Sequence, residues 1–121
     1  MSARNPSAFL NDATFTNQLG SVATFKVEGN QISGLYQTGV TADGRPAAQR
    51  KLQGILHEVD DGFLLTFSVC YEEHDSMATW NGKFFYEIPN QFTMSWLLVS
   101  NQGPNGVWGA TRVGQDTFTR N

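Results

Sequence analysis

The sequence has 121 residues, enough for one domain with a single core and too few for a second catalytic domain. Charged residues make up only 16% and the net charge is −3, which fits neither a disordered acidic tail nor a basic surface that binds nucleic acid. The apolar runs, such as Trp96 to Val99, are far shorter than the roughly 18 residues of a membrane span. We therefore expect a soluble chain with no nucleic-acid and no membrane partner.

Two features of the sequence concern the cellular compartment, but they do not distinguish between two possibilities. Cys70 is the only cysteine, so no intramolecular disulfide forms. The start of the chain lacks the apolar segment of a signal peptide. We expect either a cytoplasmic protein or a secreted one whose signal has already been removed.

Extended segments separated by turn residues follow one another along the chain. Ala23, Phe25 and Val27 alternate with polar residues, a period of two that cannot form one apolar face of a helix. Glu28-Gly29-Asn30 and Asp60-Asp61-Gly62 supply turn chemistry. No segment has a convincing helical pattern. The predicted strands are 14–19, 23–27, 32–38, 49–57, 63–71, 77–86, 92–100 and 108–119.

One dipeptide interrupts this order of strands and turns. Asn81-Gly82 is a common two-residue hairpin turn. Trp80 and Phe84 nevertheless keep the parity of one uninterrupted strand. We therefore predict that the strand continues through Asn81 and Gly82.

The strand spacing indicates the fold class. Short strands without helices favour an all-β fold, and closing the sheet removes its exposed edges. The prediction is an eight-stranded antiparallel up-and-down β-barrel, with a β-sandwich as the alternative.

Residues that could carry catalysis or bind a metal are few. The sequence has two histidines and lacks the common nucleophile, zinc-protease and phosphate-loop motifs. His57-Glu58 and the run from Glu72 to Asp75 could offer metal ligands, but charged residues in turns are usually solvated. We expect no metal and no cofactor.

Polar residues at inward-facing strand positions are the more informative feature. Asn17 and Ser21 have even separation around a bend, and Tyr36 and Thr38 are two apart on one strand, so both pairs can face a barrel interior together with Asp116. Taken singly, each could instead be a turn cap or a surface hydroxyl. As a set, buried polar groups need partners, and an eight-stranded barrel can hold one small ligand.

The strand around Trp96 is apolar on both faces. Met94, Trp96 and Leu98 share one face, while Leu97 and Val99 lie on the other. Apolar residues on the outside of a barrel are usually covered by another subunit, which predicts an oligomer.

Several blocks of sequence resemble the avidin and streptavidin family of biotin-binding proteins, from about Thr14 to Arg120. They occur in the family's order and spacing, and they are Asn17-Gln18-Leu19-Gly20-Ser21, residues 34–40, Ala78-Thr79-Trp80-Asn81-Gly82, Trp96-Leu97-Leu98 and residues 108–119. The resemblance implies a flexible segment at residues 1–12 and an avidin-like biotin-binding barrel at 13–121.

The resemblance also implies a ligand site, residue by residue. Asn17, Ser21 and Tyr36 donate to the ureido oxygen of biotin, and Asp116 and Thr38 accept from the ureido N–H groups. The ring is enclosed by apolar and aromatic side chains, namely Tyr71, Trp80, Trp96, Val40 and Leu98, with Trp108 supplied by a neighbouring subunit. A tetramer is then favoured over a dimer, and assembly and affinity are linked.

The resemblance also covers the valerate tail of biotin, and the sequence departs from the family pattern at three positions. The Ala42 N–H and Ser76 match the family's carboxylate contacts, and the charge of Asp43 lies nearby in the sequence. Ala78 stands where the family usually has a threonine that hydrogen-bonds the ring sulfur, and Tyr71 replaces a wall tryptophan. Phe15 replaces another family tryptophan, in a structural position. We expect tight biotin binding, weaker than in the tightest members.

Three rival functions remain. The same barrel could prefer another small ligand, because a fold does not fix a function, or it could bind biotin only weakly. A small enzyme could use Asp116 or His74 as a general base, although no nucleophile motif accompanies them. A purely structural oligomerisation module would bind no ligand saturably.

Overall fold

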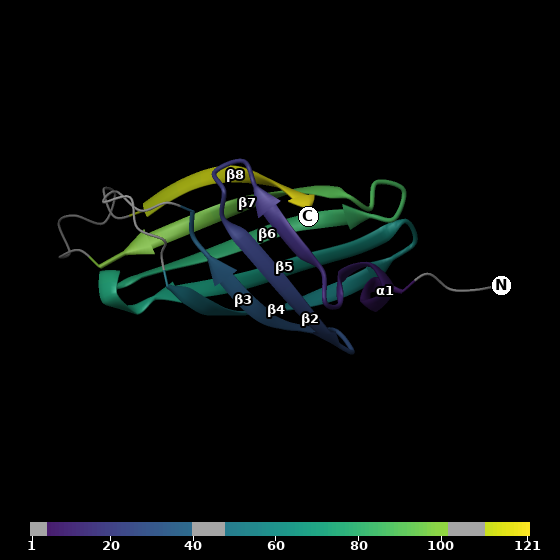
Figure 1. The fold of residues 1–121 in the computed structure, drawn as a ribbon, viewed down its shortest axis with the longest axis horizontal. Coiled ribbons are helices and arrows are strands. Elements are labelled where there is room, and N and C mark those ends of the chain that lie inside the picture. The colour runs from purple at the N-terminus through teal and green to yellow at the C-terminus, as the bar shows by residue number, and fades with distance from the viewer. Residues whose placement is uncertain (1–4, 40–47, 102–110) are drawn as a thin grey trace.

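The computed structural model describes residues 5–39, 48–101 and 111–121, and their strands form one closed antiparallel barrel (Figure 1). Each strand pairs with the next along the chain, and β8 closes the barrel by pairing with β1. This confirms the predicted eight-stranded up-and-down barrel and excludes the β-sandwich. The strands are β1 (Thr14–Asn17), β2 (Val22–Glu28), β3 (Gln31–Gln37), β4 (Gln49–Val59), β5 (Gly62–Tyr71), β6 (Ser76–Phe85), β7 (Gln91–Ser100) and β8 (Thr111–Arg120).

The alternation in the sequence sets which side chains face inward. On β5, Phe63, Leu65 and Phe67 are at most 3% exposed, whereas Leu64 between them is 46% exposed. Strand β6 runs without a break through Asn81 and Gly82, which pair with Thr66 and Leu65 of β5. The prediction of a continuous strand there is confirmed, because a hairpin turn at Asn81-Gly82 would have ended β6 and paired the residues after it with those before it.

The expectation that the chain has no helix is wrong at two short segments, α1 (Pro6–Leu10) and the 3-10 helix η1 (Glu72–His74). Helix α1 begins with a cap, in which the Asn5 side chain accepts a hydrogen bond from the Ala8 N–H at 3.0 Å. Pro6 at the first helical position needs no hydrogen-bond partner for its nitrogen. The predicted division of the chain between residues 12 and 13 stays a prediction, and on its N-terminal side Leu10 of α1 is fully buried.

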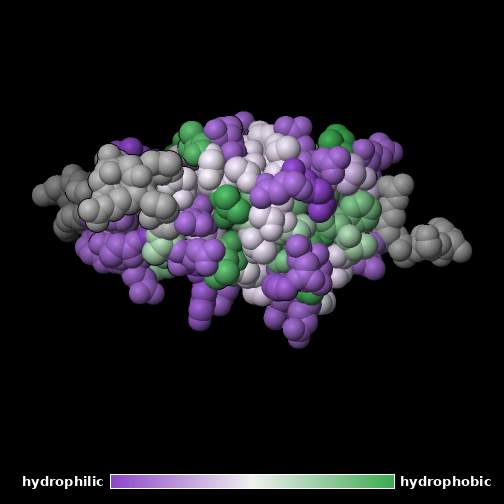
Figure 2. Space-filling model, in the orientation of Figure 1, coloured by the Kyte–Doolittle hydropathy of each residue, from purple (hydrophilic) through white to green (hydrophobic). Residues whose placement is uncertain are grey.

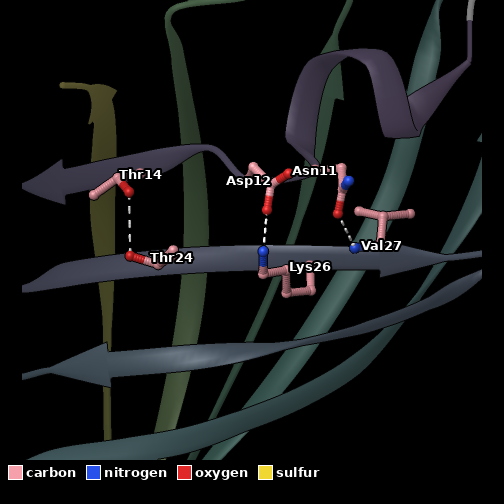
Figure 3. A network of polar contacts seen from close by, with 6 residues as sticks. All are labelled: Asn11, Asp12, Thr14, Thr24, Lys26 and Val27. Atoms are coloured by element: carbon pink, nitrogen blue, oxygen red, sulfur yellow. Dashed lines mark hydrogen bonds and ion pairs between the residues drawn. The ribbon is translucent and has the colours of Figure 1, made fainter.

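Polar contacts tie the connection after α1 to strand β2 (Figure 3). The Asn11 side chain accepts a hydrogen bond from the Val27 N–H at 2.9 Å, and Asp12 forms an ion pair with Lys26. Asp12 has a φ of +63°, a left-handed conformation that turns the chain into β1. These contacts hold α1 against one end of the barrel.

Aromatic side chains fill the barrel at the α1 end. Phe63 and Phe84 stack with their ring centroids 4.7 Å apart, and Phe92 stacks on Phe118 at 5.3 Å. In Figure 1, α1 lies at one end of the barrel and the connection between β5 and β6, which contains η1, lies at the other. The packed core therefore occupies the α1 end, and the η1 end is free to hold a cavity.

The exterior is mixed in character. Hydrophilic and hydrophobic residues are interspersed on the face seen in Figure 2. Within the described ranges, no helix has the length and apolar character needed to cross a membrane.

Candidate functional site

A cavity of about 450 Å³ opens at the η1 end of the barrel, a volume in the usual range for a small-molecule site. Its lining consists of Asn17, Leu19, Ser21, Tyr36, Thr38, Ala48, Arg50, Tyr71, Glu73, His74, Ser76, Ala78, Trp80, Trp96, Leu98 and Asp116. Every site residue that the sequence predicts within the described ranges belongs to this lining. Val40, Ala42, Asp43 and Trp108 lie outside the described residues.

The turn between β1 and β2 orients two hydrogen-bond donors, the side chains of Asn17 and Ser21. The Asn17 side-chain oxygen accepts from the backbone N–H groups of Leu19 at 3.0 Å and Ser21 at 2.9 Å. Because this oxygen is engaged, the amide NH₂ is the part of Asn17 left to bind a ligand. The Ser21 hydroxyl oxygen accepts from the Gly39 N–H at 3.0 Å, which leaves its own proton to be donated.

Tyr36 on β3 supplies a third hydroxyl in the same lining. Its side chain is 3% exposed, and burial raises the pKa of its phenol, while hydrogen bonding with Ser21 opposes part of that rise. The phenol is therefore neutral at physiological pH and can donate a hydrogen bond. Asn17, Ser21 and Tyr36 together form a group of donors suited to one acceptor oxygen.

Asp116 on β8 is the buried acceptor of the cavity, with 5% of its surface exposed. One of its oxygens accepts from Trp80 Nε1 at 2.9 Å, and the other accepts from Gln18 Nε2 at 2.8 Å. A carboxylate oxygen can accept more than one hydrogen bond, so Asp116 keeps capacity for a ligand N–H. The two contacts fix its orientation before any ligand arrives.

Thr38 adds a second candidate acceptor. Its hydroxyl oxygen is buried and has no hydrogen-bond partner among the described residues. A buried polar atom without a partner costs free energy, which a ligand with a matching group would recover.

Aromatic rings form the apolar walls. Trp80 stacks on Phe67 with the centroids 4.9 Å apart and meets Tyr36 at 5.0 Å. Trp96 on β7 pairs in register with Gly114 on β8, and a Cβ at Gly114 would lie 2.3 Å from Trp96 Cζ2. The absence of a side chain at Gly114 therefore lets the indole of Trp96 lie close against the barrel wall.

Five lining residues were not predicted from the sequence as ligand-binding residues, namely Leu19, Ala48, Arg50, Glu73 and His74. Arg50 is the most unusual of them, because its side chain is only 11% exposed. Its guanidinium donates to Glu73 through both terminal nitrogens, one of them at 2.9 Å. The signal for Arg50 was present in the sequence, since it shares the inward parity of Leu52 and Leu56 on the predicted strand 49–57.

The arrangement is suited to binding a small molecule. Within the described ranges, no three His, Cys, Asp or Glu side chains gather closely enough to hold a metal ion. The cavity has donors from the β1–β2 turn and β3, an acceptor on β8, and aromatic walls between them. It is therefore complementary to a small molecule with a polar head and an apolar body.

Comparisons with known proteins agree with this fold. The sequence model of the Avidin family matches residues 7–121. Avidin from Gallus gallus is 30% identical over 113 residues, which cover 88% of this chain and 74% of that protein. Avidin-related protein 4/5 from the same organism is 29% identical over 111 residues, with the same coverage of each chain. The crystal structure of Xenavidin is similar with a TM-score of 0.78 and 28% identity, covering 91% of this chain and 96% of that one.

Proposed function

The chain belongs to the avidin family, and from this membership we propose that it binds biotin in the mouth of its barrel. Proteins of this family are non-catalytic binders, so the chain is a binding protein and not an enzyme. The observation that carries the choice of ligand is the placement of the Asn17, Ser21 and Tyr36 donors in one cavity with the Asp116 acceptor.

The polar groups of biotin match the cavity one by one. The ureido oxygen accepts from Asn17, Ser21 and Tyr36, while one ureido N–H donates to Asp116 and the other to Thr38. Because the barrel fixes these groups before binding, little reorganisation is needed and polarisation of the ureido group is favoured. The unpartnered Thr38 hydroxyl supports this assignment, since the ligand supplies the group that it lacks.

The apolar ring system of biotin lies between the aromatic walls. Tyr71, Trp80, Trp96 and Leu98 enclose it, together with Val40. Ser76 and the Ala42 N–H bind the carboxylate of the valerate tail. With Ala78 and Tyr71 in place of larger or more polar family residues, we propose tight binding that is weaker than in the tightest members.

We further propose that the protein is a homotetramer in which Trp108 of each chain completes the cavity of a neighbour. Support comes from apolar side chains on the outer face of adjacent strands, where Met77 is 51%, Leu97 42%, Val99 45% and Val113 72% exposed. Leu97 pairs with Val113 and Met77 with Val99 in register, so the four form a continuous surface on β6, β7 and β8. Burial of such a surface against another subunit is favourable.

A variant of Asp116 tests the proposed binding mode. Asp116→Ala removes the acceptor for the ureido N–H and leaves the Trp80 N–H unpaired. We expect weaker biotin binding and a free energy of unfolding lower by about 1–3 kcal/mol. Asp60→Ala, at an exposed turn position, is the control and should change neither quantity.

Equilibrium titration and chemical unfolding measure the two effects. Biotin binding by Asp116→Ala as tight as by the unaltered protein would refute the assignment of Asp116. Tight binding of a different small ligand, without binding of biotin, would favour a barrel of the same architecture with another specificity.

A further inference from the structure

Arg50 on β4 is a cation at an inward position of the barrel, on the same face of the strand as the buried Leu52 and Leu56. Its side chain is 11% exposed, and its Nε is buried without a hydrogen-bond partner among the described residues. Burying a charged group costs free energy unless it is paired and its hydrogen-bonding groups are satisfied. Among the described residues this requirement is only partly met.

Glu73 satisfies one side of the guanidinium. It accepts from both terminal nitrogens of Arg50 in a bidentate pair, and its own side chain is 54% exposed at the rim of the cavity. A guanidinium carries further N–H groups on Nε and on the terminal nitrogens, and these remain for a second acceptor. A ligand carboxylate is such an acceptor, because planar bidentate partners suit the guanidinium.

The neighbours of Arg50 indicate which end of the ligand it meets. Its guanidinium lies over the ring of Tyr71, with 4.7 Å between the guanidinium carbon and the ring centroid. Tyr71 pairs in register with Ser76 on the next strand. Arg50, Tyr71 and Ser76 thus come from the successive strands β4, β5 and β6, and all three line the cavity.

Arg50 and the buried acceptor Asp116 lie on opposite sides of the barrel. Three strands separate β4 from β8 in either direction around the closed sheet. The cavity therefore offers an anion for N–H donors on one wall and a cation on the other. A ligand with a ureido group at one end and a carboxylate at the other is complementary to both.

We propose that Arg50, held by Glu73 and stacked on Tyr71, binds the carboxylate of the ligand and makes the cavity selective for the free acid over neutral derivatives. This inference rests on the proposed function, because it concerns the tail of biotin. It assigns to Arg50 a specificity-determining contact additional to Ser76.

The test compares biotin with biotinamide, a neutral analogue of nearly the same shape. Affinities and dissociation rates are measured by competition for the unaltered protein, Arg50→Gln and Lys83→Gln. Lys83→Gln is the matched control, because it removes a cation that pairs with Asp61 and does not line the cavity. The ratio of the two affinities isolates the contribution of the carboxylate.

We expect the unaltered protein and Lys83→Gln to bind biotin about ten- to hundredfold more tightly than biotinamide, and Arg50→Gln to lose most of this preference. An unchanged preference in Arg50→Gln would overturn the inference while leaving biotin binding in place. Failure of the unaltered protein to bind biotin would overturn the proposed function, and the inference with it. If Arg50→Gln does not fold, equal affinity of the unaltered protein for acid and amide overturns the inference, and a preference for the acid supports it.

Discussion

Ala78 lines the wall of the cavity, and its small side chain limits the contacts that a ligand can make there. It is 4% exposed and lies between Val69 and Leu98 of the adjacent strands. Ala78→Thr would place a hydroxyl beside the proposed position of the ring sulfur, a contact worth about 0.5–1.5 kcal/mol. We expect slower dissociation of biotin by about two- to tenfold. A dissociation rate identical to that of the unaltered protein would contradict this placement of the ligand.

Glu73 makes the stability of the fold depend on pH. Hydrogen bonding from Arg50 lowers the pKa of the Glu73 carboxyl from 4.5 to about 2. Because the folded-state pKa lies below the unfolded one, the ion pair stabilises the fold above about pH 4.5, and this contribution is lost as the pH falls towards 2.

The unaltered protein should therefore lose more free energy of unfolding between neutral and acidic pH than Glu73→Gln does. Denaturant titrations at the two pH values measure this difference. Because Glu73 is partly exposed, added salt should reduce it. Glu72→Gln, at an exposed neighbouring position, should behave like the unaltered protein.

Strands β7 and β8 meet where the indole of Trp96 lies over Gly114. Gly114→Ala would place a methyl group 2.3 Å from Trp96 Cζ2, so the ring must shift from its position in the cavity wall. We expect a loss of about 1–3 kcal/mol in the free energy of unfolding, together with weaker biotin binding and altered tryptophan fluorescence. Gln115→Ala, at the exposed position next to Gly114, is the control. Normal binding and fluorescence in Gly114→Ala would show that Trp96 is not confined in this way.

The elements that the sequence predicts well are those with a strict period of two. All eight strands follow from alternation such as Ala23, Phe25 and Val27, because one buried face repeats at every second residue. Helix α1 was missed because five residues are too few to show a helical period, although Asn5 followed by Pro6 was an available capping signal. Strand β1 ends at Asn17, not at Leu19, because hydrogen bonds to the Asn17 side chain turn the backbone away from the sheet.

The cavity was predicted less completely than the strands. The family resemblance identifies a site residue only at positions whose role in the family is known. Arg50 and Glu73 do not lie at such positions and were not predicted. Inward parity alone could have suggested Arg50, but its pairing with Glu73 depends on two segments far apart in the sequence being brought together by the closed sheet.

At the scale of the whole molecule, the proposed tetramer depends on the outer face of β6, β7 and β8. Val113→Lys would place a charge on this apolar surface, opposite Leu97. Burying an unpaired charge is unfavourable, so we expect the oligomer to dissociate to smaller species in light scattering. Biotin binding should weaken in parallel if Trp108 completes a neighbouring cavity. Gln53→Lys, at an exposed position on β4, should leave both unchanged.

The barrel divides into a packed aromatic end beneath α1 and a cavity at the η1 end, and biotin in that cavity is the claim on which the other proposals depend. Calorimetric titration with biotin, with tryptophan fluorescence followed on the same sample, tests it most directly, because Trp80 and Trp96 line the cavity. We predict saturation at about one biotin per chain, accompanied by a change in fluorescence. Neither heat nor a fluorescence change, from protein shown to be folded, would contradict the assignment.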